Sequence, residues 1–271
     1  MHALSTNIAD LLNQRLPAHI LCLLRNMGTS AHAMGVRAYV VGGLVRDLFL
    51  YRNNLDVDVV IEGDGIAFAS GFSDEHGARL LTYEKFGTAN IILPDNFKID
   101  VATARTETYQ RPAALPTVTP GTIKEDMFRR DFSINTLVVS LDPERFGDLL
   151  DFYQGRDDIR RKLIRVLHND SFIDDPTRIF RAVRFEKRFD FRIDDVTERL
   201  MRDAISAGCI ERLSGFRIAS ELEIISREKA PVLPIRRLEE LGVLPALIKR
   251  GENHKGLQEV LSRINEIKLM V

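Results

Sequence analysis

The chain has 271 residues, 45% of them hydrophobic and 28% charged, with a formal net charge of −1 at pH 7. This composition indicates a globular protein with a sizeable core and excludes collagen-like and highly charged disordered chains. No apolar run approaches the ~20 residues of a membrane span, and the N-terminus lacks the basic-then-apolar pattern of a secretory leader. The two cysteines show no metal-binding or redox spacing, which favours a cytoplasmic protein.

The first part of the chain predicts helix followed by strand. Residues 4–28 carry leucine and isoleucine at helical spacing, with a break at Pro17. Residues 31–35 predict a further short helix, and residues 37–41 are rich in β-formers and predict a strand.

A glycine turn follows this strand in the segment 40–62, VVGGLVRDLFLYRNNLDVDVVIE. Gly42 and Gly43 have no Cβ, so they allow the backbone to approach a phosphate closely at the start of the helix that follows. Arg46, in the first turn of that helix, adds a cation that can bind phosphate through two N–H groups. A glycine pair is equally compatible with an ordinary turn, and it lacks the GxGxxG spacing of a dinucleotide site.

Two carboxylates lie on the second strand of this segment, predicted over residues 55–61. Since side chains two apart on a strand share a face, Asp56 and Asp58 point the same way, with Cα atoms roughly 6–7 Å apart. Oxygen ligands at that spacing suit one or two hard cations such as Mg²⁺. An isolated Asp-x-Asp is also compatible with two solvated acids.

Nucleotidyl transfer requires groups that bind phosphate and carboxylates that bind metal, and here a phosphate-binding turn is joined by one helix to a carboxylate pair. GGLVRD followed by LDVDVVIEGDG resembles the signature of the class II tRNA nucleotidyltransferase and bacterial poly(A) polymerase family, part of the polymerase-β-like nucleotidyltransferase superfamily. The resemblance covers about residues 20–250. It implies an α+β catalytic head with a five-stranded mixed sheet, followed by an all-helical neck.

The remaining strands of the head are predicted over residues 79–83, 89–93 and 97–102. Most connections between the strands are too short for parallel crossovers, so a mixed sheet is expected. Asp100, on the last strand, is expected to supply a third catalytic carboxylate, as the resemblance implies. By itself it is also compatible with an acid on an edge strand.

A long irregular segment follows over residues 103–121, and loops of this length are uncommon unless they are functional. Arg105, Glu107, Tyr109 and Pro112 fit the R-x-E-x-Y-x-x-P pattern of the family's mobile loop. A tolerated surface excursion is the alternative interpretation.

Thr122 and Glu125 have the spacing of a capping box and predict the start of a helix. The following RRDFSIN resembles the family's RRDFTIN(A) motif, with Thr136 in place of its alanine. The resemblance implies nucleotide binding by three residues. Arg130 would hold the triphosphate, Asp131 would accept a hydrogen bond from a ribose hydroxyl, and Asn135 completes the motif. A salt-bridged helix end is the alternative interpretation.

The segment 148–167 resembles the family's exit from the catalytic domain, DxxxGxxDLxxxxIR, with Ile159 in place of leucine. We therefore predict a nucleotidyltransferase head over residues 1–150 and a helical neck for base selection and RNA binding over residues 151–271.

The neck opens with DDPTRIFRAVRF, in which Asp175 is a suitable N-cap and Pro176 a suitable first helical residue. Arg178, Arg181 and Arg184 recur every three residues, so they share one helix face and repel one another unless an anion lies against them. The segment resembles the family's base-selecting motif (E/D)DPxRxxRAxRF.

A carboxylate such as that of Asp175 accepts a hydrogen bond from the exocyclic amine of cytosine or adenine. A guanidinium such as that of Arg178 donates to the neighbouring ring acceptor. Uracil and guanine present a carbonyl where the amine would be, so this pair selects CTP and ATP without a template. Arg181 is expected to contact phosphate.

Beyond residue 189 the chain predicts helices over residues 194–207, 214–227, 231–241 and 257–269. The second of these contains ERLSGFRIASEL, which resembles the family's ERxSGxRxxxEL segment. Phe216 lies at its variable position.

The resemblance implies an enzyme that adds C and/or A nucleotides to the 3′ end of tRNA, with Mg²⁺ held by Asp56 and Asp58. Its partners would be ATP and/or CTP and the tRNA 3′ end. A poly(A) polymerase, an enzyme that adds only CC or only A, and a catalytically inactive RNA-binding relative are the alternatives. The text PAALPTVTPG and the SGFR segment favour the split-function group, and the intact carboxylates and arginines argue against the inactive relative. A glycosyltransferase with an Asp-x-Asp motif would explain Asp56 and Asp58 but none of the later motifs.

Overall fold

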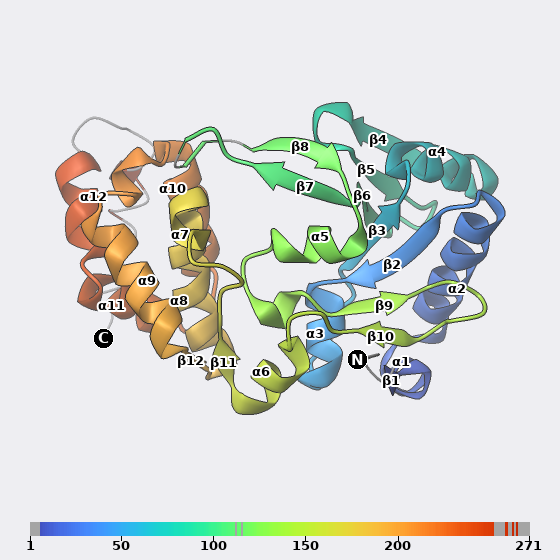
Figure 1. Ribbon diagram of the computed structural model, residues 1–271, viewed down its shortest axis with the longest axis horizontal. Helices are drawn as coiled ribbons and strands as arrows, with labels where there is room; N and C mark the ends of the chain where they lie inside the picture. The colour runs from blue at the N-terminus through green and yellow to red at the C-terminus, as the bar shows by residue number, and fades with distance from the viewer. Residues whose placement is uncertain are drawn as a thin grey trace. The chain divides into compact units, whose positions relative to one another are not determined.

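The computed structural model describes residues 6–111, 113–114, 116–251, 258–259, 262 and 264 (Figure 1). It divides into two compact units. The first unit comprises residues 1–108 and 118–160, and the second comprises residues 109–117 and 161–271. Pro112 and most of the helix predicted over residues 257–269 lie outside the described residues. No helix among the described residues combines the length and hydropathy of a membrane span.

The first unit is built on a mixed sheet, which confirms the α+β class. Its strands run in the order β1-β10-β9-β2-β3-β6-β5-β4, and only β3 and β6 pair in parallel. Their bounds are β1 (Thr6–Asn7), β10 (Asp148–Leu150), β9 (Val138–Ser140), β2 (Arg37–Val41), β3 (Val57–Glu62), β6 (Lys98–Thr103), β5 (Thr88–Ile92) and β4 (Arg79–Tyr83).

The sheet has eight strands rather than the five predicted. The five expected strands are β2 to β6, and β1, β9 and β10 extend the sheet beyond β2. These three additional strands have two or three residues each. Such short segments carry no useful alternation of apolar and polar residues, so tertiary pairing rather than local pattern makes them strands.

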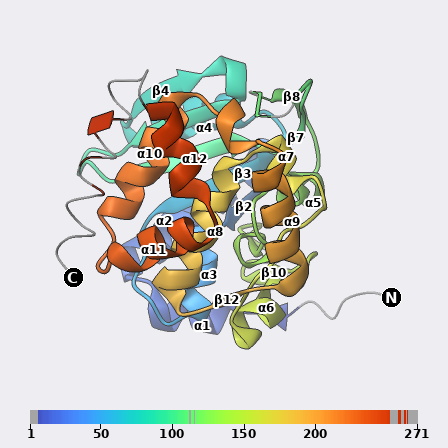
Figure 2. The same ribbon diagram turned by 90° about the vertical axis from the view of Figure 1, so that its left-hand side faces the viewer.

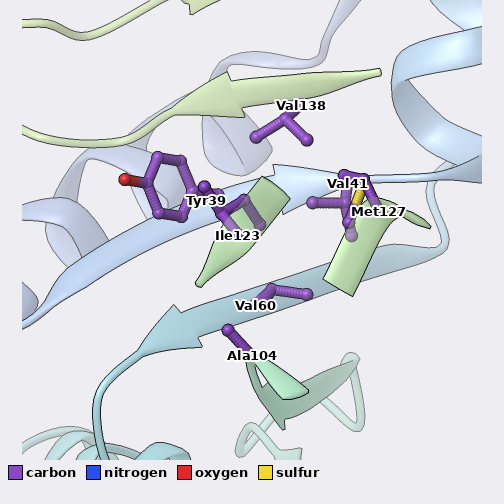
Figure 3. Packing of buried hydrophobic residues seen from close by; sticks show 7 residues of the cluster. All are labelled: Tyr39, Val41, Val60, Ala104, Ile123, Met127 and Val138. Carbon is purple, nitrogen blue, oxygen red and sulfur yellow. The ribbon is translucent and has the colours of Figure 1, made fainter. Parts of the chain in front are cut away.

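One side of the sheet carries the predicted catalytic carboxylate Asp58. Helix α5 (Ile123–Phe128) packs on this side, where it begins with the predicted capping box of Thr122 and Glu125. Figure 3 shows the buried cluster that joins α5 to the strands, formed by Tyr39, Val41, Val60, Ala104, Ile123, Met127 and Val138. Because side chains alternate along β3, Asp58 lies on the same side of the sheet as Val60.

The opposite side of the sheet is covered by α2 (Ala18–Ala33) and α4 (Gly65–His76), which contact β2, β5 and β6 (Figure 1). The fully buried Val59 and Ile61 point to that side. Short helices complete the unit: α1 (Ala9–Arg15), α3 (Gly43–Phe49), α6 (Gly155–Arg161) and the 3-10 turns η1 (Glu84–Phe86) and η2 (Ser133–Asn135). The strands β7 (Arg105–Thr108) and β8 (Thr117–Pro120) form a separate pair within the segment expected to be irregular.

The predicted end of a helix at Gly28 is wrong, and so is the separate helix over residues 31–35. Helix α2 continues to Ala33, and a Cβ on Gly28 would lie 1.8 Å from the carbonyl oxygen of Leu141. Gly28 therefore permits close packing inside the helix. The chain leaves the helix at Gly35, whose φ of +71° is typical of a helix C-terminus.

The second unit is a group of helices around α8 (Thr177–Phe189), which is contacted by α7 (Ser171–Asp174), α10 (Gly215–Ser226) and α11 (Val232–Glu240) (Figure 2). The apolar side of α8 is buried through Ile179, Phe180, Ala182 and Val183. The unit also contains α9 (Asp195–Ser206), the 3-10 turn η3 (Ile210–Arg212), α12 (Val243–Gly251) and a parallel pair of β11 (Leu163–Ile164) and β12 (Arg192–Ile193). The expectation of an all-helical unit therefore needs this one correction.

Candidate active site

The turn between β2 and α3 brings a cation and a carboxylate together around a glycine. Gly42 has φ +70° and ψ −127°, a conformation that side chains other than hydrogen rarely allow. A Cβ on Gly42 would lie 2.9 Å from Nη1 of Arg130 and 3.7 Å from Oδ2 of Asp58. The backbone of Gly42 thus borders both the Arg130 guanidinium and the Asp58 carboxylate.

The three predicted carboxylates lie at the start of β3 and on β6. Asp58 is in register with Asp100 on the neighbouring parallel strand. Asp56 immediately precedes β3, which begins at Val57 rather than at residue 55 as predicted. Its backbone N–H donates to Oδ1 of Asn54 at 2.9 Å. The sequence prediction of three neighbouring acids is therefore compatible with the geometry.

Asp100 differs from Asp58 in how its carboxylate is engaged. Lys98 Nζ lies 2.8 Å from Oδ1 of Asp100, and the side-chain amide of Asn90 donates to the same carboxylate oxygen. The strand neighbours of Asp100 thus neutralise and orient its carboxylate.

The surroundings of Asp58 concentrate negative charge. The pKa of Asp58 is raised to about 6, chiefly by burial; the Arg130 guanidinium opposes the rise, and the charges of Asp56 and Asp100 contribute to it. A divalent cation would relieve this repulsion, and carboxylate oxygens are the ligands that hard cations prefer. Among the described residues, no three His, Cys, Asp or Glu side chains converge as a closed metal site. The donor set therefore fits a cation such as Mg²⁺, which is commonly held by one or two carboxylates and completed by water and substrate phosphates.

The two consecutive arginines of RRDFSIN have different surroundings. The fully buried Asp126 accepts hydrogen bonds from Arg129 Nε at 3.0 Å and Nη2 at 2.8 Å. Arg129 also donates to Glu107, which pairs with Arg105 as well. Arg130 has only a longer contact to Asp126, at 3.4 Å, while its Nη1 lies beside Gly42. Arg129 is therefore the structural arginine, and Arg130 is the one placed toward the carboxylates.

Asp131 and Asn135 lie in a buried cluster with Arg46. Oδ1 of Asp131 accepts from the backbone N–H of Phe132 at 2.8 Å and from the side-chain amide of Asn135 at 2.9 Å. Arg46 Nη1 donates to Oδ1 of Asn135 at 2.6 Å, and its other donors bind Asp47. Only 5% of Arg46 is exposed. These contacts favour a positioning role for Arg46 over the direct phosphate contact expected from the sequence.

The DxxxGxxD segment, residues 151–158, contacts the chain next to this cluster at Ser133. Asp151 accepts hydrogen bonds from the backbone N–H groups of Gly155 and Arg156 at the start of α6. The buried Asp158 accepts a hydrogen bond from Ser133. A Cβ on Gly155 would lie 2.3 Å from the carbonyl oxygen of Ser133, so only glycine allows this approach.

In the second unit, Asp175 is held by three donors. Its Oδ1 accepts from Thr177 N at 2.9 Å, from Thr177 Oγ1 at 2.6 Å and from Arg217 Nη2 at 2.7 Å. Helix α8 begins at Thr177, and Pro176 is its N-cap, one residue later than predicted. Arg217 lies in the SGFR segment and also donates to the carbonyl oxygen of Ala113. Nothing in the spacing of the sequence identified Arg217 as the partner of Asp175.

The arginines along α8 are less alike than their spacing suggested. Arg178 is 5% exposed and donates to Ser171 Oγ at 2.7 Å. Arg181 lies over the ring of Phe185, 5.5 Å from its centroid. Arg184 Nη1 lies 3.7 Å from Glu228, which also pairs with Arg188 at 3.1 Å. An acidic residue of the chain itself thus partly neutralises the C-terminal part of this helix face.

The comparisons with known proteins agree with this geometry. Residues 38–165 match the family model of the poly A polymerase head domain. The chain is 44% identical over 267 residues to an A-adding tRNA nucleotidyltransferase of Geobacter sulfurreducens, covering 97% of this chain and 30% of that protein. It is 39% identical over 246 residues to an A-adding tRNA nucleotidyltransferase of Halalkalibacterium halodurans, covering 90% of this chain and 58% of that protein.

A solved structure of the Thermotoga maritima CCA-adding enzyme complexed with tRNA is also similar. It matches with a TM-score of 0.81 and 43% identity, over 89% of this chain and 55% of that one. The chain thus spans about a third to slightly over half of the length of these proteins.

Proposed function

Since residues 38–165 belong to the family of poly A polymerase head domains, we propose that this chain is a template-independent RNA nucleotidyltransferase. It adds C and/or A nucleotides to the 3′ end of tRNA and releases pyrophosphate. One observation carries the proposal: Asp58 lies in register with Asp100 and borders Arg130 across the backbone of Gly42. The A-adding activity named for the two relatives favours addition of the terminal A to a tRNA that ends in CC.

We assign the chemistry to the two parts of the chain separately. Residues 1–150 are the catalytic head, and residues 151–271 are the neck that selects the base and binds RNA. The two cysteines are free thiols, which supports activity in the cytoplasm.

In the head, Asp56 and Asp58 would hold Mg²⁺, and Asp100 would support Asp58 from the adjacent strand. Bound Mg²⁺ lowers the pKa of the RNA 3′-hydroxyl and neutralises charge on the triphosphate and the leaving pyrophosphate. Arg130 and the backbone at Gly42 and Gly43 bind the triphosphate.

Other residues of the head recognise and orient the nucleotide. Asp131 accepts a hydrogen bond from the ribose, which favours ribonucleotides over deoxyribonucleotides. Asn135 orients Asp131 through the hydrogen bond between their side chains.

In the neck, Asp175 accepts from the exocyclic amine of adenine or cytosine, and Arg178 donates to the adjacent ring nitrogen. UTP and GTP would leave these groups unpaired, and an unpaired buried polar group costs about 1–3 kcal/mol. Arg181 contributes phosphate contact. Arg217 fixes the orientation of the Asp175 carboxylate.

The test is single-nucleotide incorporation. A tRNA that ends before CCA, after C or after CC is offered with one labelled nucleotide and Mg²⁺. ATP addition to the third substrate alone identifies an A-adding enzyme, and CTP addition to the first two with ATP addition to the third identifies a CCA-adding enzyme.

Two results would contradict the proposal. Long A tracts on unrelated RNA would identify a poly(A) polymerase. An absence of incorporation, combined with nucleotide binding, would favour an inactive RNA-binding relative or dependence on further parts of the protein.

A further inference from the structure

We infer that Asn54 is a positioning residue for Asp56, and that it acts through a largely buried polar network that also holds Asp131. The inference rests on the proposed function, because it takes Asp56 to be a metal ligand. We call this group the Asp47 network; its members are Asn54, Asp47, Arg46, Asn135 and Asp131.

The Asn54 side chain links two elements through the two ends of its amide. Its Nδ2 donates to Oδ2 of Asp47 in α3 at 2.8 Å. Its Oδ1 accepts from the backbone N–H of Asp56 at 2.9 Å. Residues 52–56 form neither helix nor strand, so these side-chain bonds provide the order that a helix or a strand would provide elsewhere.

The charge of Asp47 determines which way the amide points. An ionised carboxylate only accepts hydrogen bonds, so the NH₂ group of Asn54 must face Asp47. The amide oxygen is then the atom left to face Asp56. An amide in the opposite orientation would place two acceptors against each other, so the amide oxygen of Asn54 is directed toward Asp56.

Asp47 is itself held rigidly by Arg46. Arg46 Nε and Nη2 donate to the two carboxylate oxygens of Asp47 at 2.9 Å and 3.0 Å. Both residues are buried, with 5% and 7% of their surfaces exposed. A two-point hydrogen bond between a guanidinium and a carboxylate fixes direction as well as distance. A loss of either charge would leave the other buried without its partner.

The same guanidinium connects to the residues proposed to bind the ribose. Arg46 Nη1 donates to Asn135, and Asn135 donates to Asp131. Gly43 makes room for the junction, because a Cβ there would lie 3.3 Å from Nδ2 of Asn54 and 3.7 Å from Nη2 of Arg46. One continuous set of hydrogen bonds therefore runs from Asp56 to Asp131.

This arrangement explains why Arg46 is buried although its motif resembles a phosphate-binding turn. Groups that orient a metal ligand affect metal affinity by roughly 10–100-fold when they are replaced. We therefore expect Asn54 to influence cation binding, although its own side chain is not a proposed metal ligand.

The experiment measures Mn²⁺ binding to the full chain by electron paramagnetic resonance, which quantifies free Mn²⁺ and needs no enzymatic turnover. The variants are Asn54→Ala and Asn54→Asp. Asn54→Asp keeps the shape and the acceptor for Asp56 but sets a second carboxylate against Asp47. Asn53→Ala is the matched control, since Asn53 is the exposed neighbour in the same segment. Thermal unfolding in EDTA reports on the fold of each variant.

We expect Asn54→Ala and Asn54→Asp to weaken Mn²⁺ binding by about 10-fold or more, while Asn53→Ala binds like the wild type. Both Asn54 variants leave Asp47 in place, so its buried pair with Arg46 is kept. A structural role alone would lower the unfolding temperature without weakening Mn²⁺ binding.

Two outcomes would overturn the inference, and they differ. If the wild type binds Mn²⁺ and both Asn54 variants bind it equally well, Asn54 does not position Asp56, and the proposed function stands. If the wild type fails to bind Mn²⁺, the metal assignment in the proposed function is lost together with the inference. Should Asn54→Ala fail to fold, the comparison between Asn54→Asp and Asn53→Ala still decides whether Asn54 affects Mn²⁺ binding.

Discussion

Asp58 on β3 and Asp100 on β6 are register partners on the one parallel strand pair of the main sheet, yet their carboxylates have different neighbours. Asp100 is paired with Lys98 and bound by Asn90. Asp58 is half-buried beside Arg130 and close to two other acids, and its pKa is raised to about 6. The Asp100 carboxylate is thus paired with a cation, whereas burial and the neighbouring acids disfavour the charged form of Asp58, which a bound cation would stabilise.

Replacement of Asp58 by asparagine should therefore stabilise the metal-free protein at neutral pH. Because the folded-state pKa exceeds the ordinary value of 3.8, folding favours the protonated form. This contribution is fully present below that ordinary value and is lost as the pH rises through about 6. With ~1.4 kcal/mol for each pKa unit, the gain for Asp58→Asn is on the order of 1–3 kcal/mol above pH 6.

Urea unfolding in EDTA at several pH values measures this difference. It should grow as the pH rises from 3.8 to about 6 and stay constant above that, while the variant loses nucleotide incorporation. Equal stability of the two proteins at every pH would contradict the prediction.

Asp100→Asn should be milder than Asp58→Asn. The Asp100 carboxylate is already neutralised by Lys98. We therefore expect Asp100 to support Asp58 rather than to bind the metal itself, and we expect Asp100→Asn to lower kcat by roughly 10-fold. Asp58→Asn and Asp56→Ala should abolish incorporation while circular dichroism stays unchanged. Steady-state kinetics at saturating Mg²⁺ compares the three variants, and an equal loss for Asp100→Asn would make it a full metal ligand.

Gly42→Ala should impair nucleotide binding as well as the fold. The backbone at Gly42 is in a conformation that costs other residues about 1–3 kcal/mol, and a Cβ would lie 2.9 Å from Arg130 Nη1. We expect a lower unfolding temperature and a higher KM for ATP. Gly77→Ala is the control, because Gly77 also has positive φ but no atom lies within 4 Å of its Cβ position. If Gly77→Ala raised KM equally, the effect at Gly42 would be one of backbone strain alone.

Arg217→Met should relax base selection although Arg178 itself is unchanged in this variant. Arg217 holds Asp175 through a 2.7 Å hydrogen bond, and without it the carboxylate can turn away from the exocyclic amine. We expect UTP incorporation relative to ATP to rise by about 10-fold, the equivalent of ~1.4 kcal/mol.

Arg227→Met is the matched control. Arg227 is an exposed arginine just beyond the C-terminal end of the same helix, and it pairs with Glu223. Unchanged discrimination against UTP in Arg217→Met would show that Asp175 keeps its orientation without Arg217. Unchanged discrimination in Arg178→Ala would place base selection on other residues.

His168 should make stability depend on pH. Burial and the nearby positive charge of Arg178 lower the pKa of His168, against the smaller opposing influence of Asp174 and Asp170. Because the folded-state pKa lies below the ordinary value of 6.5, the stabilisation is present above pH 6.5 and is lost as the pH falls through the folded-state pKa. His168→Gln should therefore lose less stability between about pH 7 and pH 5 than the wild type. Parallel unfolding curves for the two proteins across this range would contradict the prediction.

Local sequence patterns determined the parts of this protein in which neighbouring residues cooperate. The glycine turn, the Asp-x-Asp pair and the capping box of Thr122 and Glu125 each depend on the spacing of neighbouring residues, and the sequence alone predicts each of them. The strands β2 to β6 followed from β-formers bounded by turn residues. The class of the fold followed from these elements and from the resemblance.

Only the tertiary structure decided what lies opposite each of these residues. The short strands β1, β9 and β10 exist because partners distant in sequence complete their hydrogen bonds. The sequence predicts a phosphate ligand at Arg46, whereas in the structure its guanidinium donates to Asp47 and Asn135. Arg217 and Glu228 became partners of Asp175 and Arg184 through packing between helices. The charge and spacing of a side chain are local properties, whereas its burial and its hydrogen-bond partners depend on long-range contacts that no local pattern encodes.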